Sequence, residues 1–200
     1  MNVIIRPYEP ADLYSVMAVW NSIITEGDAF LEETPLSPEE MSAFLDQFRG
    51  VYCAVIGSEI AGVYLLRKLY PGKGSHVAEV IYAVKFSFRG LGIGKQMSQH
   101  SFRTARDLGF ASVAAVRVPG SNSAAMNYLT KCGFAPAGEI PRGYRRERVV
   151  VVEPAPQPAE EPKKGLFGKI FEKNKPAEPA APVEKLVVDY FSLYSYVKEV

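Results

Sequence analysis

Hydrophobic and polar positions along the chain follow a helical period in several stretches, and each stretch predicts a helix. Apolar residues at helical spacing over 13–24 follow Asp12 and predict the first helix. The next begins at Ser37-Pro38-Glu39-Glu40, where the serine can cap the helix, the proline suits its first turn and the last glutamate completes a capping box. Further helices are predicted over 94–108 and 122–131.

Short apolar runs between turn residues predict the strands. They lie at residues 3–6, 51–56, 60–69, 77–84 and 111–118, with one or two more strands within 134–152 and another from residue 186. Gly57-Ser58-Glu59 joins two of these runs as a hairpin. The order of strands and helices predicts a mixed α/β fold with a partly antiparallel sheet.

Residues 153–183 interrupt this pattern. They are rich in Pro, Ala, Glu and Lys, a composition that favours a solvated and extended chain. Within them, the segment Leu166–Phe171 places its apolar side chains on one helical face with lysines on either side. A helix this short is marginal in water. Docking on the protein's own domain, or disorder, is therefore favoured over a membrane-surface or partner-docking role.

Composition narrows the class of protein. A chain of 200 residues that is 48% apolar can bury one sizeable core, so one main domain is expected. The net charge of +1 gives no support for binding nucleic acid. The sequence shows neither a secretory signal nor an apolar run of the ~18 residues that a membrane span needs. Cys53 and Cys132 have neither metal-ligand nor redox spacing, which fits buried reduced thiols, no metal and a cytoplasmic location.

The stretch Arg89-Gly90-Leu91-Gly92-Ile93-Gly94 lies between a predicted strand and a predicted helix. Glycines allow a tight turn that exposes backbone N–H groups, and a helix start adds unpaired donors, so the loop can cradle a phosphate or pyrophosphate. A Walker loop is excluded because Gln96 follows Lys95 where a hydroxyl residue is required. The glycine spacing does not fit a dinucleotide fingerprint either. A plain strand-to-helix turn is the alternative.

The pattern Arg89-x-x-Gly92-x-Gly94 resembles the Arg/Gln-x-x-Gly-x-Gly/Ala loop of the GCN5-related N-acetyltransferase (GNAT) superfamily, which binds the pyrophosphate of acetyl-CoA. The resemblance covers residues 2–149 and 184–198. It extends to the first strand and the following helix start, to the last helix and the strand after it, and to the final strand: Ile4-Ile5-Arg6-Pro7 with Asp12, Asn122 with Ala125, Gly133 and Phe134, and Val188-Asp189-Tyr190.

Three segments look most like the phosphinothricin acetyltransferase-like branch of this superfamily: Gly27-Asp28-Ala29-Phe30, Thr34-Pro35-Leu36 and Ile140-Pro141. The resemblance implies a GNAT-type mixed, mostly antiparallel sheet flanked by helices, with a Pro-rich insertion before the last strand. Residues 1–152 would form the GNAT domain, 153–183 the insertion, and 184–200 the final strand. Members of this branch are often dimeric, so the resemblance also allows a homodimer.

The resemblance implies acetyl-CoA as cosubstrate and no metal. The fourth and fifth strands, 77–84 and 111–118, would diverge so that the pantetheine arm pairs with exposed backbone in the gap. The backbone N–H of Val84 would bind the oxyanion. The cofactor-binding residues would be Val84, the loop residues and the first residue of the last helix: Arg89, Gly90, Leu91, Gly92, Ile93, Gly94, Lys95 and Asn122.

Acetyl transfer to an amine also needs groups that move protons. An alkyl amine has a pKa near ~10.4, so a base or a water relay must remove its proton. Glu79 on the central strand is the candidate base, and Glu33 is a second candidate for base or acceptor recognition. The tyrosine that protonates the leaving thiolate in the family is Leu129 here. Tyr128 precedes it, about 100° away around the helix, and is the candidate acid.

The acceptor side would include Phe30 and Glu33, with Arg142, Tyr144 and Arg145 from a later turn. The arginines could favour an acceptor with a carboxylate, as an amino acid has. A solvated turn is the alternative for this cluster. His76 and His100 are interpreted as surface or strand-end residues.

The expected function is transfer of an acetyl group from acetyl-CoA to the primary amine of a small molecule, such as an amino acid or an analogue, by direct attack in a ternary complex. Two alternatives stay open. One is the same chemistry on a protein or peptide amine. The other, suggested by Leu129 and the insertion, is an acyl-CoA-binding sensor or interaction module without catalysis.

Overall fold

The computed structural model describes residues 2–152 and 183–200. It divides into two units, one formed by Met1–Arg146 with Tyr190–Val200 and the other by Glu147–Asp189. The expected boundaries at 152 and 183 stay predictions, and the segment Leu166–Phe171 lies outside the described residues. Among those described, no helix is long and apolar enough to cross a membrane.

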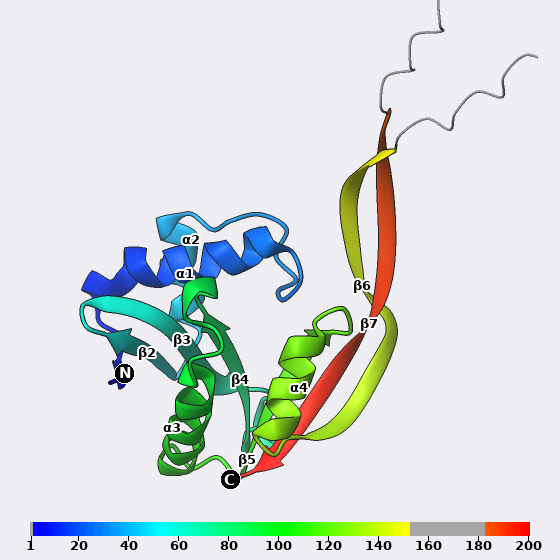
Figure 1. Ribbon diagram of the computed structural model, residues 1–200. Coiled ribbons are helices and arrows are strands. Elements are labelled where there is room, and N and C mark those ends of the chain that lie inside the picture. Colours follow the sequence, from blue (N-terminus) through cyan, green and yellow to red (C-terminus); the bar gives the residue numbers. More distant parts are fainter. Residues whose placement is uncertain (1, 153–182) are drawn as a thin grey trace, which may run out of the picture. The chain divides into compact units, whose positions relative to one another are not determined.

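Strands of the described residues form one sheet in the order β1-β2-β3-β4-β5-β7-β6, with β4 at its middle (Figure 1). The pairs β1–β2, β2–β3, β3–β4 and β5–β7 are antiparallel, and β4–β5 is parallel. The predicted mixed and mostly antiparallel α/β fold is therefore confirmed. The strands are β1 (Ile4–Pro7), β2 (Gly50–Ile56), β3 (Glu59–Lys68), β4 (Val77–Val84), β5 (Ser112–Pro119), β6 (Ala135–Val152) and β7 (Val183–Glu199).

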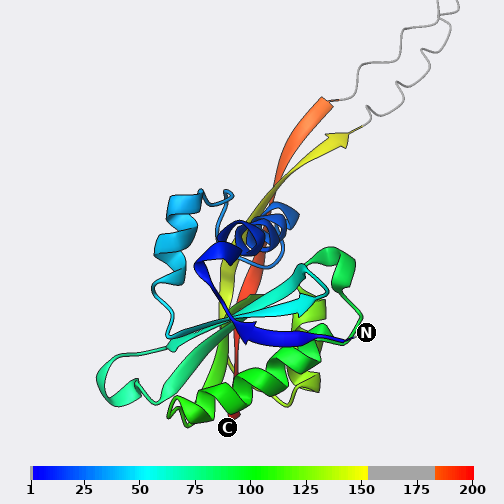
Figure 2. The same cartoon turned by 90° about the vertical axis from the view of Figure 1, so that its left-hand side faces the viewer.

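Two pairs of helices cover opposite faces of the sheet (Figure 2). The helices α1 (Leu13–Glu26) and α2 (Pro38–Leu45) pack on the face that includes Val63 and Leu65 of β3. The helices α3 (Ile93–Asp107) and α4 (Ser123–Lys131) pack on the face that includes Tyr64 and Leu66. Because side chains of a strand alternate between faces, β3 contributes to both cores and is buried along most of its length.

Local sequence signals set the helix ends, among them the predicted capping box at Ser37. The Glu40 N–H donates to Ser37 Oγ at 3.2 Å, and the Ser37 N–H donates to the Glu40 carboxylate at 2.8 Å, which completes the capping box. Gly109 follows α3 with a φ of 81°, which glycine adopts at little cost. Asn122 caps α4 by accepting the Ala125 N–H at 3.0 Å.

An ion pair fixes the entry into α1. The Asp12 carboxylate accepts hydrogen bonds from Arg6 at 2.6 and 2.8 Å and from the Glu9 N–H at 2.9 Å. The bonds from Arg6 outweigh the effect of burial and hold the pKa of Asp12 below its usual range. Strand β1 is thereby linked to the first helix by a charged group that must stay ionised.

His100, interpreted as a surface or strand-end residue, is half-buried and does not lie at a strand end. His100 lies within α3, and its Nδ1 is 2.6 Å from the Tyr64 hydroxyl on the sheet. Burial lowers the pKa of His100, which favours the neutral ring as a hydrogen-bond partner. The sequence could not show this, because the two residues meet only when α3 packs on β3. His76 is exposed, as expected.

Candidate active site

Strands β4 and β5 separate after a short parallel pairing. Their register runs from Val77 opposite Ser112 to Glu79 opposite Ala114 and stops there. The Lys85 N–H donates to Ala61 on β3 at 3.0 Å. Since backbone groups of successive residues in a strand point to alternate sides, the Val84 N–H points away from β3, toward the gap beside β5. This orientation is the one that a backbone oxyanion donor needs, and the role itself stays a prediction.

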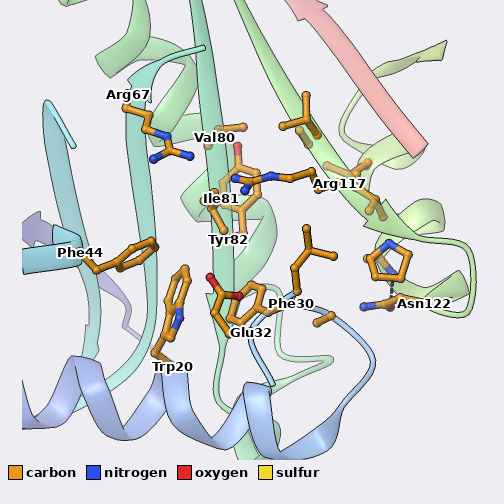
Figure 3. A pocket seen from close by; sticks show the side chains of 18 of the residues that line it. Trp20, Phe30, Glu32, Phe44, Arg67, Val80, Ile81, Tyr82, Arg117 and Asn122 are labelled. Carbon is orange, nitrogen blue, oxygen red and sulfur yellow. Dashed lines mark hydrogen bonds between the residues drawn. The ribbon is translucent and has the colours of Figure 1, made fainter. Parts of the chain in front are cut away.

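A cavity of about 390 Å³ occupies this gap (Figure 3). Its lining includes Ile81, which packs with the α1/α2 core, and Val80 and Val118, which pack with the α3/α4 core. Because residues from both faces of the sheet line it, the cavity passes between the separated strands. It is large enough for a small ligand.

One wall of the cavity is aromatic. The Trp20 and Phe30 rings stack with centroids 4.2 Å apart, and the Phe44 ring lies 5.0 Å from Trp20. Phe30 was expected on the acceptor side and lines the cavity. Trp20 and Phe44 were missed, because apolar residues at helical spacing predict only core.

The opposite wall is charged. Arg67 of β3 lies directly across from Glu79 of β4 in the strand register, and its Nε donates to Glu79 Oε2 at 2.6 Å. Arg117 Nη2 donates to the other carboxylate oxygen. Glu79 is 2% exposed, and both arginines line the cavity. Glu79 lies on the central strand as expected, but both of its oxygens already accept a guanidinium N–H. Its role as base stays a prediction.

A bulge in β5 turns Arg117 toward this wall. Ala115 pairs with Tyr196 and Val118 with Tyr194, so β5 has one residue more than β7 between these pairs. The backbone of Arg117 takes a φ of 61°, which residues other than glycine rarely adopt. The apolar run had predicted a regular strand, and neither bulge nor arginine gave a signal in the sequence.

The glycine loop has the form of an anion cradle. Gly90 and Gly92 have φ angles of 78° and 79°, and a Cβ at either would meet nothing within 4 Å. Helix α3 begins at Ile93, and the Gln96 N–H donates to the Gly92 carbonyl at 3.3 Å. The N–H groups of residues 93–95 precede this first hydrogen bond of the helix, so they have no partner within the helix. Open space, backbone donors and a helix N-terminus fit a pyrophosphate.

Arg89 holds the loop in place. Its guanidinium pairs with Glu26 at the end of α1, with contacts of 3.0 and 2.7 Å, and its Nε donates to the Val84 carbonyl at 3.1 Å. The side chain therefore connects α1, the end of β4 and the loop. Leu91 and Lys95 are exposed beside it. Their contacts with a cofactor, and that of Arg89, stay predictions.

Residues of α4 divide between the cavity and the neighbouring helix. Asn122 and Leu129 line the cavity, and Leu129 is 3% exposed. Tyr128 instead faces α3, where its hydroxyl donates to the Gly94 carbonyl at 2.8 Å and contacts Ser98 Oγ. Burial raises the pKa of Tyr128. The structure thus places a leucine, and not the neighbouring tyrosine, at the cavity, and the acid role of Tyr128 stays a prediction.

The other expected acceptor residues lie elsewhere. The Tyr144 hydroxyl donates to the Gly27 carbonyl at 2.7 Å, and the Arg142 guanidinium lies 4.2 Å from the Tyr190 ring centroid. Arg145 pairs with Glu33 at 3.7 Å on the surface. In the described part of the chain, none of these side chains lines the 390 Å³ cavity. Their place in acceptor binding stays a prediction.

Comparison with known proteins places this site in context. A model of the acetyltransferase (GNAT) family matches residues 16–134. The L-methionine sulfoximine/L-methionine sulfone acetyltransferase of Pseudomonas paraeruginosa is 28% identical over 149 residues, which are 71% of this chain and 86% of that protein.

Solved structures share the fold. A GNAT superfamily phosphinothricin acetyltransferase from Sinorhizobium meliloti, solved in complex with AcCoA, has a TM-score of 0.72 at 16% identity, covering 100% of this chain and 89% of that one. An N-acetyltransferase from Staphylococcus aureus Mu50 has a TM-score of 0.72 at 18% identity, covering 100% and 99%.

Proposed function

Because this chain belongs to the acetyltransferase (GNAT) family, whose enzymes use acetyl-CoA, we propose that it acetylates the primary amine of a small molecule, an amino acid or an analogue. The observation that supports the proposal most is the cavity between β4 and β5. It joins the strand gap, where the cosubstrate's pantetheine arm would lie, to an aromatic and charged pocket of a size suited to a small acceptor.

The glycine loop and the gap would hold acetyl-CoA, which supplies the activated acetyl group. The N–H groups at the start of α3 would bind the pyrophosphate, with Gly90 and Gly92 leaving space for it. The exposed backbone of β4 from Val80 to Val84 would pair with the pantetheine arm. Asn122 lines the cavity from the start of α4 and would contact the same arm.

Direct attack forms a C–N bond between the amine and the acetyl carbon, and the C–S bond to CoA then breaks. The Val84 N–H would stabilise the negative charge that the carbonyl oxygen gains. The amine must lose a proton, and the carboxylate of Glu79 accepts two arginine hydrogen bonds. A relay through water in the cavity fits this geometry better than direct transfer to Glu79. A thiolate leaves without much assistance, since its pKa is near ~8.5.

A sensor without catalysis is the second candidate, and one observation favours it. Leu129 occupies the cavity where the family resemblance places a proton donor, and Tyr128 faces α3. Acetyl-CoA binding without turnover would be the mark of such a protein.

The test is release of CoA thiol from acetyl-CoA across amino acids, their sulfoximine and sulfone analogues, polyamines and peptides, with acetyl-CoA binding measured in parallel by calorimetry. We expect turnover with amino acids or their analogues. Turnover with peptides alone would establish the peptide enzyme instead. Binding without release on every amine would support the sensor, and no binding would refute the cofactor assignment.

A further inference from the structure

We propose that Arg67 and Arg117 form the subsite that binds the acceptor's carboxylate, and that Glu79 is the positioning residue for both. This assignment presupposes the amine acetylation proposed above and names its substrate class, amines that bear a carboxylate. It differs from the expectation that Arg142 and Arg145 recognise the acceptor and that Glu79 is a base.

The charge balance of the wall favours an anion. Two guanidinium groups share one carboxylate, that of Glu79, so the cluster has a net charge of +1. Both arginines line the cavity, with side chains 25% and 45% exposed, whereas the buried Glu79 does not line it and borders a separate hollow with both arginines. An anion in the cavity would therefore meet the arginines and not the glutamate.

Hydrogen-bond donors that the protein does not use make the cluster suited to a carboxylate. A guanidinium has five N–H donors in a rigid fork. Arg117 Nη2 donates to Glu79. Among the described residues, no other group accepts a hydrogen bond from this guanidinium. Arg67 uses Nε for Glu79 and Nη1 for Gln47 at 3.3 Å. The remaining donors suit a carboxylate, which arginine binds through two parallel hydrogen bonds.

Glu79 sets the position of both guanidinium groups. An ionised carboxylate that is 2% exposed requires partners, and each of its oxygens accepts from a different arginine. The two side chains point toward each other across β4 (Figure 3). Without the carboxylate that both contact, the two positive charges would repel each other and separate.

The backbone at Arg117 is held in a strained conformation that aims its side chain at the cavity. Positive φ at a residue other than glycine is unfavourable and persists only where the surroundings enforce it. Here the β5 bulge and the pair with Glu79 enforce it. Such strain concentrates at ligand sites, and this one re-aims a charged side chain into a cavity.

The rest of the lining restricts the acceptor's side chain. Trp20, Phe30 and Phe44 offer apolar contact, and Glu32 lies beside Trp20 and Phe30, away from the two guanidinium groups (Figure 3). An acidic side chain would meet the Glu32 carboxylate. The expected substrates are therefore amino acids with one carboxylate and an apolar or neutral side chain.

The first test compares turnover of the best amino acid acceptor with that of its carboxamide, which keeps the amine and loses the charge. Arg117→Gln should lower kcat/KM for the acid by about 10- to 100-fold, mainly through KM, and change the carboxamide by less than about threefold. Arg117→Lys should recover part of the loss. Arg103→Gln, on the exposed face of α3, is the matched control and should match the wild-type protein. An equal fall in kcat/KM for acid and carboxamide, or no fall, would overturn the subsite. Turnover by the wild-type protein would still uphold the proposed function.

Glu79→Gln separates positioning from base catalysis. A positioning role predicts a raised KM for the acid, little change in kcat, and a kcat that still rises with pH as in the wild-type protein. A base predicts a fall in kcat of about 10²- to 10⁴-fold with acid and carboxamide alike. That result would refute the positioning role.

The second test needs no turnover. With CoA bound to the protein, calorimetry compares the affinity for the N-acetylated amino acid, which is the product of the proposed reaction, with the affinity for the carboxamide of that product. The wild-type protein should bind the acid at least about tenfold more tightly, and Arg117→Gln should abolish the preference. If no amine is acetylated, the proposed function fails, and this preference still decides the subsite. Equal binding of acid and carboxamide by the wild-type protein would refute it.

Discussion

Single residues of this protein take their roles from partners that are distant in the chain. Glu79 shows this most clearly. The sequence offers an acidic residue on a central strand, which suits a base. The structure surrounds it with Arg67 and Arg117, from the strands on either side, and leaves no carboxylate oxygen without an arginine donor. A residue type that suggests proton transfer thus lies in an ion-pair cluster, and we propose that it positions the two arginines.

Asp12 gives a prediction on pH and stability. Folding lowers the pKa of this carboxyl, so its stabilisation is present above the unfolded value of ~3.9 and is lost as the pH falls through the lower folded value. Asp12→Asn should unfold at a lower temperature at pH 7, at a cost of about 1–2 kcal/mol once the partial exposure of Arg6 is discounted. Thermal unfolding from pH 8 to pH 3 should show a constant difference from the wild-type protein above about pH 5, which shrinks below pH 4. A difference that grows in acid would contradict the ion pair.

Tyr128 gives a prediction on catalysis. Its hydroxyl donates to the Gly94 carbonyl, on the side of α4 that faces α3. Tyr128→Phe should destabilise the protein by about 1 kcal/mol through this lost hydrogen bond. The kcat should stay within about threefold of wild type, whereas loss of a general acid costs about 10²- to 10⁴-fold. Steady-state kinetics beside thermal unfolding distinguishes the two, and a large fall in kcat at unchanged stability would restore the acid role.

At the scale of elements, the site depends on where regular structure stops. Strands β4 and β5 pair over only a few residues, and the gap beyond their last pair becomes the cavity. The β5 bulge turns Arg117 inward. The loop before α3 replaces a side-chain cap with glycines in the left-handed region, which leaves the helix N-terminus open to an anion. Each of these departures from regular pairing or capping contributes a part of the site.

The glycine loop gives a prediction with an internal control. Gly92 and Gly109 precede and follow α3 with φ angles of 79° and 81°, and a Cβ at either meets nothing within 4 Å. Replacing either glycine by alanine should lower the free energy of unfolding by about 1 kcal/mol through backbone strain. Only Gly92→Ala should also weaken acetyl-CoA binding, by about tenfold, because the N–H groups of the cradle would move. Calorimetric titration of both variants checks this, and equal affinities would argue against a pyrophosphate site at the loop.

At the scale of the whole molecule, the site lies within one unit. The cavity lining, the glycine loop and the strand gap all belong to the unit formed by Met1–Arg146 and Tyr190–Val200. Strand β7 returns to it through pairs with β5, from Leu193 to Glu199. Activity should therefore depend on the pairing of β7 with β5 and not on the chain between Val152 and Val183.

Replacement of residues 153–182 by a four-residue Gly-containing turn tests that expectation. The shorter connection should leave acetyl-CoA affinity and kcat unchanged. It should stabilise the protein slightly, by about 1–2 kcal/mol, since closing a loop about seven times longer costs that much more entropy. Kinetics and thermal unfolding of the full-length and shortened chains decide the matter. A loss of turnover in a folded, acetyl-CoA-binding variant would assign the segment a role in the reaction.

The sequence by itself determined the elements, the fold class and the position of the glycine loop before α3. Helix periods, strand runs, the Ser37 and Asn122 caps and the glycines are local features, and each acts through neighbours a few residues away. Asn122 and Phe30, expected to bind cofactor and acceptor, both line the cavity, and these roles stay predictions.

Only the tertiary structure decided which charged side chains meet. Glu79 is 12 residues from Arg67 and 38 from Arg117 in the chain, and their contact depends on strand register and on a bulge in β5. Register and bulge follow from pairing between distant strands, which local periodicity does not encode. For the same reason the sequence gave no sign that folding brings Arg67, Arg117 and Trp20 to the cavity, while the acceptor roles of Arg142 and Tyr144 stay predictions.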